Sequence, residues 1–153
     1  MHSHRKSLRV RLALTVGLLM AACAPAAQAA SYVMFRDPSC GCCMAWRDHA
    51  KEHLDHEVQV REDVAMPEVK ERLGVPADLA SCHTTVIEGY VIEGHVPARE
   101  IKRLLKERPD YIRGLAVSGM PVGSPGMEMG NRTQPYQVIA FGDEGRSVYA
   151  AYP

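Results

Sequence analysis

Three cysteines within four residues, Cys40-Gly41-Cys42-Cys43, constrain this chain more than any other feature of its sequence. They follow an apolar segment at residues 31–35, which predicts a short buried strand, and the turn-forming pair Asp37-Pro38. Ser39 is a suitable N-cap, and apolar residues then recur at helical spacing as far as residue 56. The cysteines therefore lie on the first turn of a helix, where the helix dipole favours thiolate over thiol. We expect them to be reactive or to bind metal.

The patterns that follow predict a mixed α/β fold. They indicate a strand at 57–60, a helix at 66–74, a β-hairpin at 84–95 around Glu88-Gly89, and a helix at 97–109. The resulting order, βαβαββα, is that of a thioredoxin-like fold. A second hairpin, with strands at 136–141 and 147–152, is expected to extend or flank the sheet.

The fold analogy places the fourth cysteine of the domain. In thioredoxin-like folds the loop before the third strand packs against the N-terminus of the first helix, and here that loop is residues 80–84. Cys82 would then face the three cysteines of the helix. Thioredoxins usually carry a cis-proline in this loop, whereas this chain has Cys82-His83-Thr84, so a potential ligand occupies the place of the proline.

Residues 1–30 have the layout of a secretory signal peptide. Basic residues precede an apolar run at 12–22 and a small-residue segment at 27–29. The apolar run is shorter than the roughly 20 residues that span a bilayer, so no membrane span is expected in the mature protein. The alternative is lipidation at Cys23, with "AQAA" as the competing cleavage site.

The mature chain, residues 31–153, is predicted to be a single thioredoxin-like, metal-binding domain. It carries 14 Lys and Arg against 18 Asp and Glu, a net charge of −4, and so has no electrostatic reason to bind nucleic acid. A domain of this size builds a core without disulfides, so its cysteines are not needed as a framework.

Four facing thiolates suit a soft metal: Cu(I), zinc or an iron–sulfur cluster. Zinc prefers separated cysteine pairs, and the adjacent Cys42 and Cys43 fit that geometry poorly. Short spacings fit a polynuclear Cu(I) site in which each sulfur bridges two ions. The competing hypothesis is a thiol oxidoreductase or copper reductase, because Cys40 and Cys43 have the spacing of a C-x-x-C redox pair.

A glycine- and proline-rich segment at 114–130, without helical or strand period, carries further soft donors. It contains Met120 and Met127, as well as Met129, and thioether is a Cu(I) ligand. The alternative is that these side chains fill gaps where the loop packs on the domain. Together with the cysteines, the methionines favour a loop that covers the metal site.

The histidines are interpreted individually. His83, beside Cys82, is predicted to be a ligand, a supporting donor or a cation that stabilises a thiolate, and the sequence does not choose among these. The spacing of His49, His53 and His56 would suit a metal-binding face, but the charged residues between them favour a solvated polar face. His95 is interpreted as a residue at the start of the helix at 97–109, with a role in the site as the alternative. Trp46 is assigned to the core.

Four ordered motifs resemble the CopG-type copper-resistance proteins: "CGCCMAW", "SCHT", "GYVIEGHVP" and "GLAVSGMPVGSPGME". The resemblance covers essentially the whole mature chain. It implies a periplasmic, thioredoxin-like protein that binds several Cu(I) ions through bridging cysteines and works beside other periplasmic copper-handling proteins. The implied bridging ligands are Cys40, Cys42, Cys43 and Cys82, and Met120 and Met127 fall within the last motif. Ser118 stands where proline is common in the family, a change that affects the stiffness of the loop.

Overall fold

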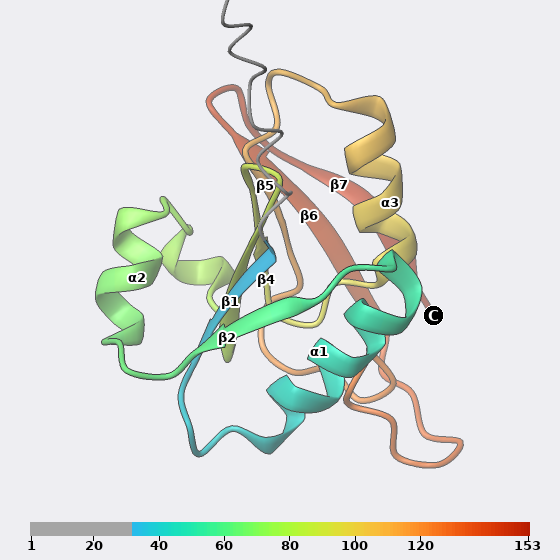
Figure 1. Ribbon diagram of the computed structural model, residues 1–153. Helices are drawn as coiled ribbons and strands as arrows, with labels where there is room; N and C mark the ends of the chain where they lie inside the picture. Colours follow the sequence, from blue (N-terminus) through green and yellow to red (C-terminus); the bar gives the residue numbers. More distant parts are fainter. Residues whose placement is uncertain (1–31) are drawn as a thin grey trace, which may run out of the picture.

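The computed structural model describes residues 32–153, and the predicted signal peptide and Cys23 lie outside them. This part of the chain forms one seven-stranded sheet with three α-helices (Figure 1). The strands are β1 (Tyr32–Arg36), β2 (Val58–Arg61), β3 (His83–Ile87), β4 (Tyr90–Glu93), β5 (Gly114–Ala116), β6 (Tyr136–Gly142) and β7 (Gly145–Tyr152). The helices are α1 (Gly41–Leu54), α2 (Met66–Arg72) and α3 (Ala98–Glu107), with a 3₁₀ turn at η1 (Ala77–Leu79).

The spatial order of the strands is β2-β1-β3-β4-β5-β6-β7. β1 is parallel to β2 and β4 to β5, and the remaining pairs are antiparallel. Helices α1 and α3 pack together on one face of the sheet, and α2 lies on the other (Figure 1). The α/β class is confirmed, and the elements up to α3 follow the predicted order. No helix within residues 32–153 is long and apolar enough to cross a bilayer.

Helix α1 begins at Gly41 with Cys40 as its N-cap, so the prediction that Ser39 caps the helix is wrong. The Ser39 side chain is used locally instead: its N–H and its hydroxyl both donate to the Asp37 carboxylate, at 2.8 and 2.5 Å. This Asx-type turn ends the chain segment that leaves β1. The three cysteines still lie on the first turn of α1, as the sequence predicts.

Strand β5 was not predicted, because three residues are too few to show strand periodicity. It pairs with both β4 and β6 and thereby joins the C-terminal hairpin to the main sheet. Gly114 is required here, since a Cβ would collide with the Val91 carbonyl and the Phe141 ring on either side. The loop at 114–130 is therefore irregular only after its first three residues, and the hairpin extends the sheet rather than flanking it.

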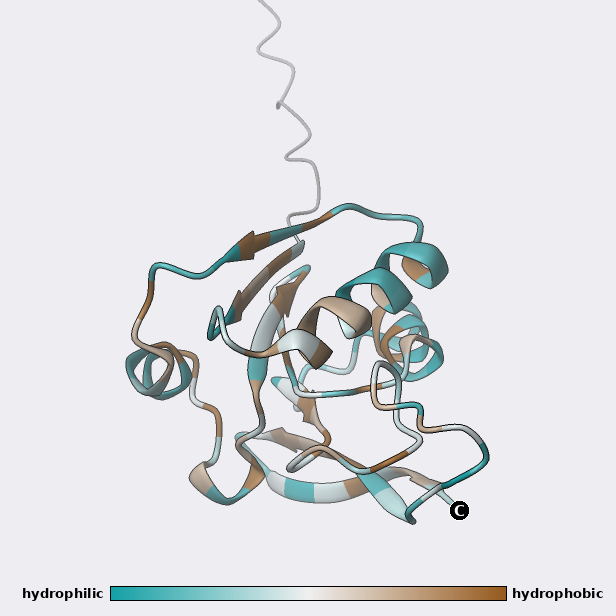
Figure 2. Cartoon of the chain, turned by 90° about the horizontal axis from the view of Figure 1, so that it is seen from below, coloured by the Kyte–Doolittle hydropathy of each residue, from teal (hydrophilic) through white to brown (hydrophobic). Residues whose placement is uncertain are grey.

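The core lies between the sheet and the α1–α3 layer. Trp46 is fully buried, as predicted, and its indole N–H donates to the Val96 carbonyl at 2.9 Å. Cys43 is also fully buried. In Figure 2 the first turn of α1 is apolar whereas its later turns are hydrophilic. The cysteine end is therefore the more apolar end of α1, although Ala50 and Leu54 also bury the later turns against the core.

Candidate metal centre

The four cysteines of the described chain converge at one point. Arg36, the last residue of β1, is the register partner of His83, the first residue of β3, so the loop that ends at Cys82 lies beside the start of α1. The ligand atoms of the four residues all lie within 4.8 Å of one another. The residues are Cys40, Cys42, Cys43 and Cys82. The juxtaposition expected from the sequence is therefore present, across about forty residues of chain.

In this structure Cys40 and Cys43 form a disulfide, and Cys42 and Cys82 are free thiols. The Cys42 sulfur lies 3.2 Å from the Cys40 sulfur. The C-x-x-C pair is thus joined with a third thiol held against it. Reduction of the pair would leave four thiols in the same volume.

The Cys82 thiol lies beside the Cys42 thiol and the ring nitrogens of His83 and His95. Burial, followed by the charge of Cys42, raises its pKa to about 12. Its sulfur lies 3.3 Å from Nδ1 of His83 and 3.1 Å from Nε2 of His95. At neutral pH the sulfur carries its proton, so a metal must displace that proton to bind there.

His95 lies in this centre, so the structure favours the alternative in which it has a site role over its interpretation as a residue at the start of α3. Its Nδ1 lies 2.8 Å from the Pro125 carbonyl, which only accepts, so Nδ1 carries the proton. Burial lowers its pKa, so the ring is neutral and the Nε2 lone pair is directed at the Cys82 sulfur. A fixed tautomer with an available ring nitrogen is the arrangement that metal-binding histidines use.

A register count could have found His95. The hairpin pairs Thr84 with Glu93 and turns at Glu88-Gly89, so each pair of opposed residues sums to the same number. Continuing two steps past Thr84 and Glu93 brings Cys82 opposite His95. The two-residue turn is visible in the sequence, and extending its register past the ends of the strands predicts that Cys82 and His95 are opposed.

His83 is fully buried, and its Nε2 has no hydrogen-bond partner. Burial is the main cause that lowers its pKa, and the neighbouring His95 and Lys70 act in the same direction. Burial therefore favours the neutral ring and argues against the alternative in which it is a thiolate-stabilising cation. The ring also packs against Trp46, with centroids 4.6 Å apart. The ligand and supporting-donor alternatives remain.

Of the two predicted methionines, Met120 reaches the cysteines. Its sulfur lies 3.8 Å from the Cys42 sulfur, and the side chain is 49% exposed. Met127 lies half-buried in the same loop, where its N–H donates to the Ser124 carbonyl at 2.8 Å. The polar contacts found within residues 32–153 do not connect the Met127 sulfur to the cysteines.

The loop that carries these methionines lies directly on the first turn of α1. Gly126 has φ +81°, and a Cβ there would come within 2.6 Å of the Trp46 backbone nitrogen and 3.0 Å of the Cys42 carbonyl oxygen. Only glycine permits this approach. The neighbouring Pro125 carbonyl is the group that holds His95, so the contact at Gly126 also fixes one side of the metal centre.

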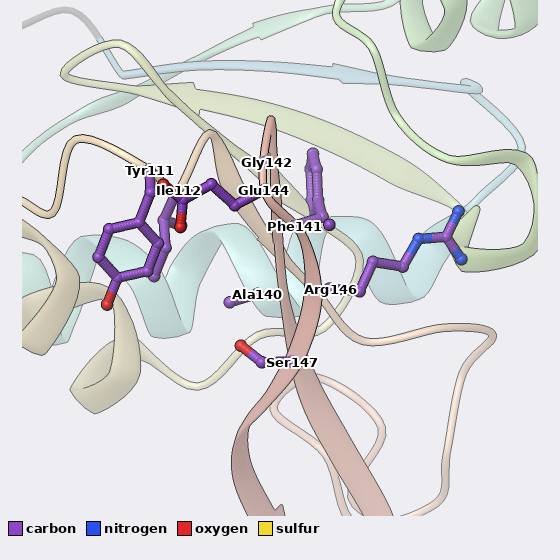
Figure 3. Close-up of a pocket in the computed structure, with 9 residues that line it drawn as sticks. Tyr111, Ile112, Ala140, Phe141, Gly142, Glu144, Arg146 and Ser147 are labelled. Atoms are coloured by element: carbon purple, nitrogen blue, oxygen red, sulfur yellow. The ribbon is translucent and has the colours of Figure 1, made fainter.

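Two pockets of the described chain lie away from the cysteines. One of about 180 Å³, between the β6–β7 turn and the segment before β5, is lined by residues that include Tyr111, Glu144 and Arg146 (Figure 3). A more apolar one of about 440 Å³ lies between α2 and η1. Neither is lined by a cysteine or a histidine, so the cysteine cluster is the candidate site.

Two solved chains are similar to this one along most of its length. The first, titled "Copper resistance protein copG- Form 1", is 47% identical with a TM-score of 0.74, and the match covers 80% of this chain and 97% of that one. The second, titled "Copper resistance protein copG- Form 2", is 46% identical with a TM-score of 0.75, over 81% and 98%. The chain belongs to the CopG copper-resistance protein family.

A family model described as "Protein of unknown function, DUF411" also matches, over residues 79–127. No curated protein matches the chain. The matched segment contains Cys82, His83 and His95 and both predicted methionines, but not the cysteines of α1. The DUF411 family model therefore covers the side of the metal centre that carries Cys82 and the two histidines, opposite the first turn of α1.

The one noted departure from the CopG pattern, Ser118, has a visible role. Its hydroxyl donates to the Asp78 carbonyl in η1 at 3.2 Å. The next residue is tied down as well, because the Ser81 hydroxyl donates to the Gly119 carbonyl. Two hydroxyls thus restrain the start of the methionine loop where a proline would otherwise stiffen it.

Proposed function

We propose that this chain is a periplasmic copper-resistance protein that binds several Cu(I) ions in a cysteine-bridged cluster. The observation that carries the proposal is the convergence of four cysteine ligand atoms within 4.8 Å of one another. Thiolate is the ligand that Cu(I) prefers, and sulfurs this close together suit bridging between ions. Membership of the CopG family supports copper as the cargo.

In the proposed centre, the bridging ligands are Cys40, Cys42, Cys43 and Cys82. His95 and His83 are the nitrogen donors next to Cys82, and the ligand atoms of these three residues lie within 4.8 Å of one another. Met120 is the thioether beside Cys42, and Met127 is the least supported of the predicted ligands. Copper capture would release protons, because buried thiols must ionise to bind.

The test is an anaerobic Cu(I) titration of the reduced mature protein against a competing chelator, with free thiols counted in parallel. We expect saturation above one copper per chain with all four thiols protected. One copper or none per chain would overturn the cluster. Cys42→Ser is the diagnostic variant, since it should cripple the cluster while leaving the Cys40 and Cys43 pair intact.

A thiol oxidoreductase or copper reductase is the second candidate, and the disulfide between Cys40 and Cys43 favours it. In the copper reaction, two Cu(II) ions each take one electron from a thiolate. The two sulfurs then form the disulfide, and two Cu(I) ions result. Cys42→Ser should keep this activity, so the same variant separates the two functions.

The localisation and the fold class are also part of the proposal. Residues 1–30 have the composition of a signal peptide, and export to the periplasm is the corresponding proposal. Mass spectrometry of the secreted chain would distinguish cleavage near residue 30 from lipidation at Cys23. The thioredoxin-like class is supported by the β2-β1-β3-β4 order, with β1 parallel to β2 and antiparallel to β3.

A further inference from the structure

We propose that Arg36 and Glu93 are positioning residues that hold the two cysteine-bearing segments at cluster spacing before any metal arrives. The inference rests on the proposed function and deepens it. Neither residue is a candidate ligand. Each is a buried charged side chain at the end of a central strand, and each bonds the backbone of one of the two segments that bring the cysteines together.

Arg36 anchors the segment that leads into α1. Its guanidinium donates to the Pro38 carbonyl at 2.8 Å and to the Cys40 carbonyl at 2.9 Å. A second terminal nitrogen donates to Glu62 at 2.5 Å. Arg36 is 5% exposed, although Glu62 is largely in solvent. One guanidinium nitrogen, Nη2, thus bonds both carbonyls of the turn that presents the first cysteine, and the ion pair with Glu62 uses the other terminal nitrogen.

Glu93 anchors the segment that carries Cys82. Its carboxylate accepts from the Ser81 N–H at 2.6 Å and from the Thr84 hydroxyl at 2.6 Å, on either side of the cysteine. Lys70 of α2 supplies the compensating charge. Glu93 is fully buried, and Lys70 is mostly buried. Glu93 therefore holds the Ser81 backbone and the Thr84 side chain, on either side of Cys82, without contacting the Cys82 sulfur.

The chemistry of the site explains why such anchors are useful. The four cysteine sulfurs lie within 4.8 Å of one another, yet they come from two separate segments of the chain. Loops free to relax would move apart in the metal-free protein, and copper would then have to reassemble them. Groups that orient metal ligands without binding the metal typically change metal affinity by about 10–100-fold.

The first experiment needs no copper. In a background of Cys40→Ser and Cys43→Ser, only Cys42 and Cys82 remain in the mature chain, and their disulfide equilibrium with glutathione reports how closely the two segments are held. This equilibrium gives the effective concentration of one thiol at the other, and we expect Arg36→Met to lower that concentration by about tenfold or more. Replacing the buried pair by Lys70→Met with Glu93→Leu should do the same, and such apolar replacements are usually tolerated by the fold.

The controls separate positioning from general structure. Glu62→Gln leaves both carbonyl contacts of Arg36 in place and should match the parent protein. Arg36→Lys keeps the charge and one nitrogen that can donate to both carbonyls, as Nη2 of Arg36 does, so it should retain more of the parent value than Arg36→Met. Glu93→Gln keeps an acceptor for the Ser81 N–H and should rescue most of the loss. Circular dichroism melts establish that each variant is folded.

The second experiment is Cu(I) titration of the same variants with all four cysteines present. We expect affinity to fall by about 10–100-fold in Arg36→Met and in the Lys70/Glu93 replacement. Folded variants with unchanged glutathione equilibrium and unchanged copper affinity would overturn the inference. Equal losses in Glu62→Gln would also overturn it. A parent protein that binds no copper would reject the proposed function, whereas the glutathione measurement would still decide the positioning role.

Discussion

The two ends of helix α1 both carry metal-type side chains, and only one end forms a candidate site. At the first turn, cysteines meet Cys82 and His95 from the β3–β4 hairpin and Met120 from the C-terminal loop. In the later turns, His49 and His53 are spaced for chelation, and their rings stack with centroids 4.4 Å apart. Yet no third ligand from another element joins them among the described residues.

The ring nitrogens explain the difference. Nε2 of His49 accepts the N–H of Ala98, the first residue of α3, at 3.2 Å. Nδ1 of His53 donates to the His49 carbonyl at 2.9 Å, and the His56 ring stacks on Tyr32. His49 therefore links α1 to α3, His53 bonds within α1, and His56 packs on β1. Spacing on one helix is insufficient: a metal site needs lone pairs that are not already in use and ligands from several elements.

The largest expected effect is that of Cys82→Ser. Cys82 is the one residue shared by the four-cysteine group and the Cys82–His83–His95 group, so its loss should reduce bound Cu(I) from several ions to at most one per chain. Anaerobic titration measures this. An unchanged stoichiometry in the folded variant would mean that the two groups are not connected through this sulfur.

His95→Leu tests the missed member of the cysteine end. Removing the Nε2 that lies 3.1 Å from the Cys82 sulfur should lower Cu(I) affinity by about 10–100-fold while stoichiometry changes less. Competition against a chelator of known affinity gives the value. Wild-type affinity in this variant would reduce His95 to a packing residue, and the two ends of α1 would then differ only in their cysteines.

Gly126→Ala should loosen the contact between the methionine loop and the cysteine end. The strained φ and the collision with the Trp46 backbone nitrogen together should lower the free energy of unfolding by about 2–4 kcal/mol. Gly130→Ala is the matched control, because Gly130 also has positive φ but no atom within 4 Å of its would-be Cβ. Urea denaturation of both variants isolates the contact, and equal losses would argue against it.

The histidine end predicts a pH dependence of stability. Burial lowers the pKa of His49 below its ordinary 6.5, so the unfolded chain binds a proton more readily than the folded one. The contribution of the neutral His49 ring to the free energy of unfolding is complete above pH 6.5, and it is lost as the pH falls toward the lowered pKa of the folded state. Urea titrations of the metal-free protein between pH 7 and 5 should show a shallower slope in His49→Gln. His83 and His95 act with the same sign, so identical slopes would place the effect there.

The smallest expected effect is that of His53→Ala. Its side chain is exposed and bonds only within its own helix, so copper stoichiometry and affinity should match the wild type. Stability should change by less than about 0.5 kcal/mol. A loss of copper in the titration would show that the histidine end participates after all.

Local patterns predicted the regular elements well. The apolar spacing of α1 and α3, the Glu88-Gly89 turn and the C-terminal hairpin all appear, with boundaries shifted by a few residues. The misses have physical causes. Strand β5 is held by its neighbours rather than by its own three residues, and Ser39 bonds to Asp37 instead of capping α1. Neighbouring strands and side chains override local preference in both cases.

By itself the sequence determined which soft donors exist and that three of them begin a helix, because helix and turn signals depend on neighbours a few residues apart. It also contained the hairpin register that opposes Cys82 and His95. Tertiary structure alone decided which histidines keep a free lone pair, that Met120 rather than Met127 approaches Cys42, and that buried charges hold the two segments. These depend on distances between atoms far apart in the chain, and packing sets those distances.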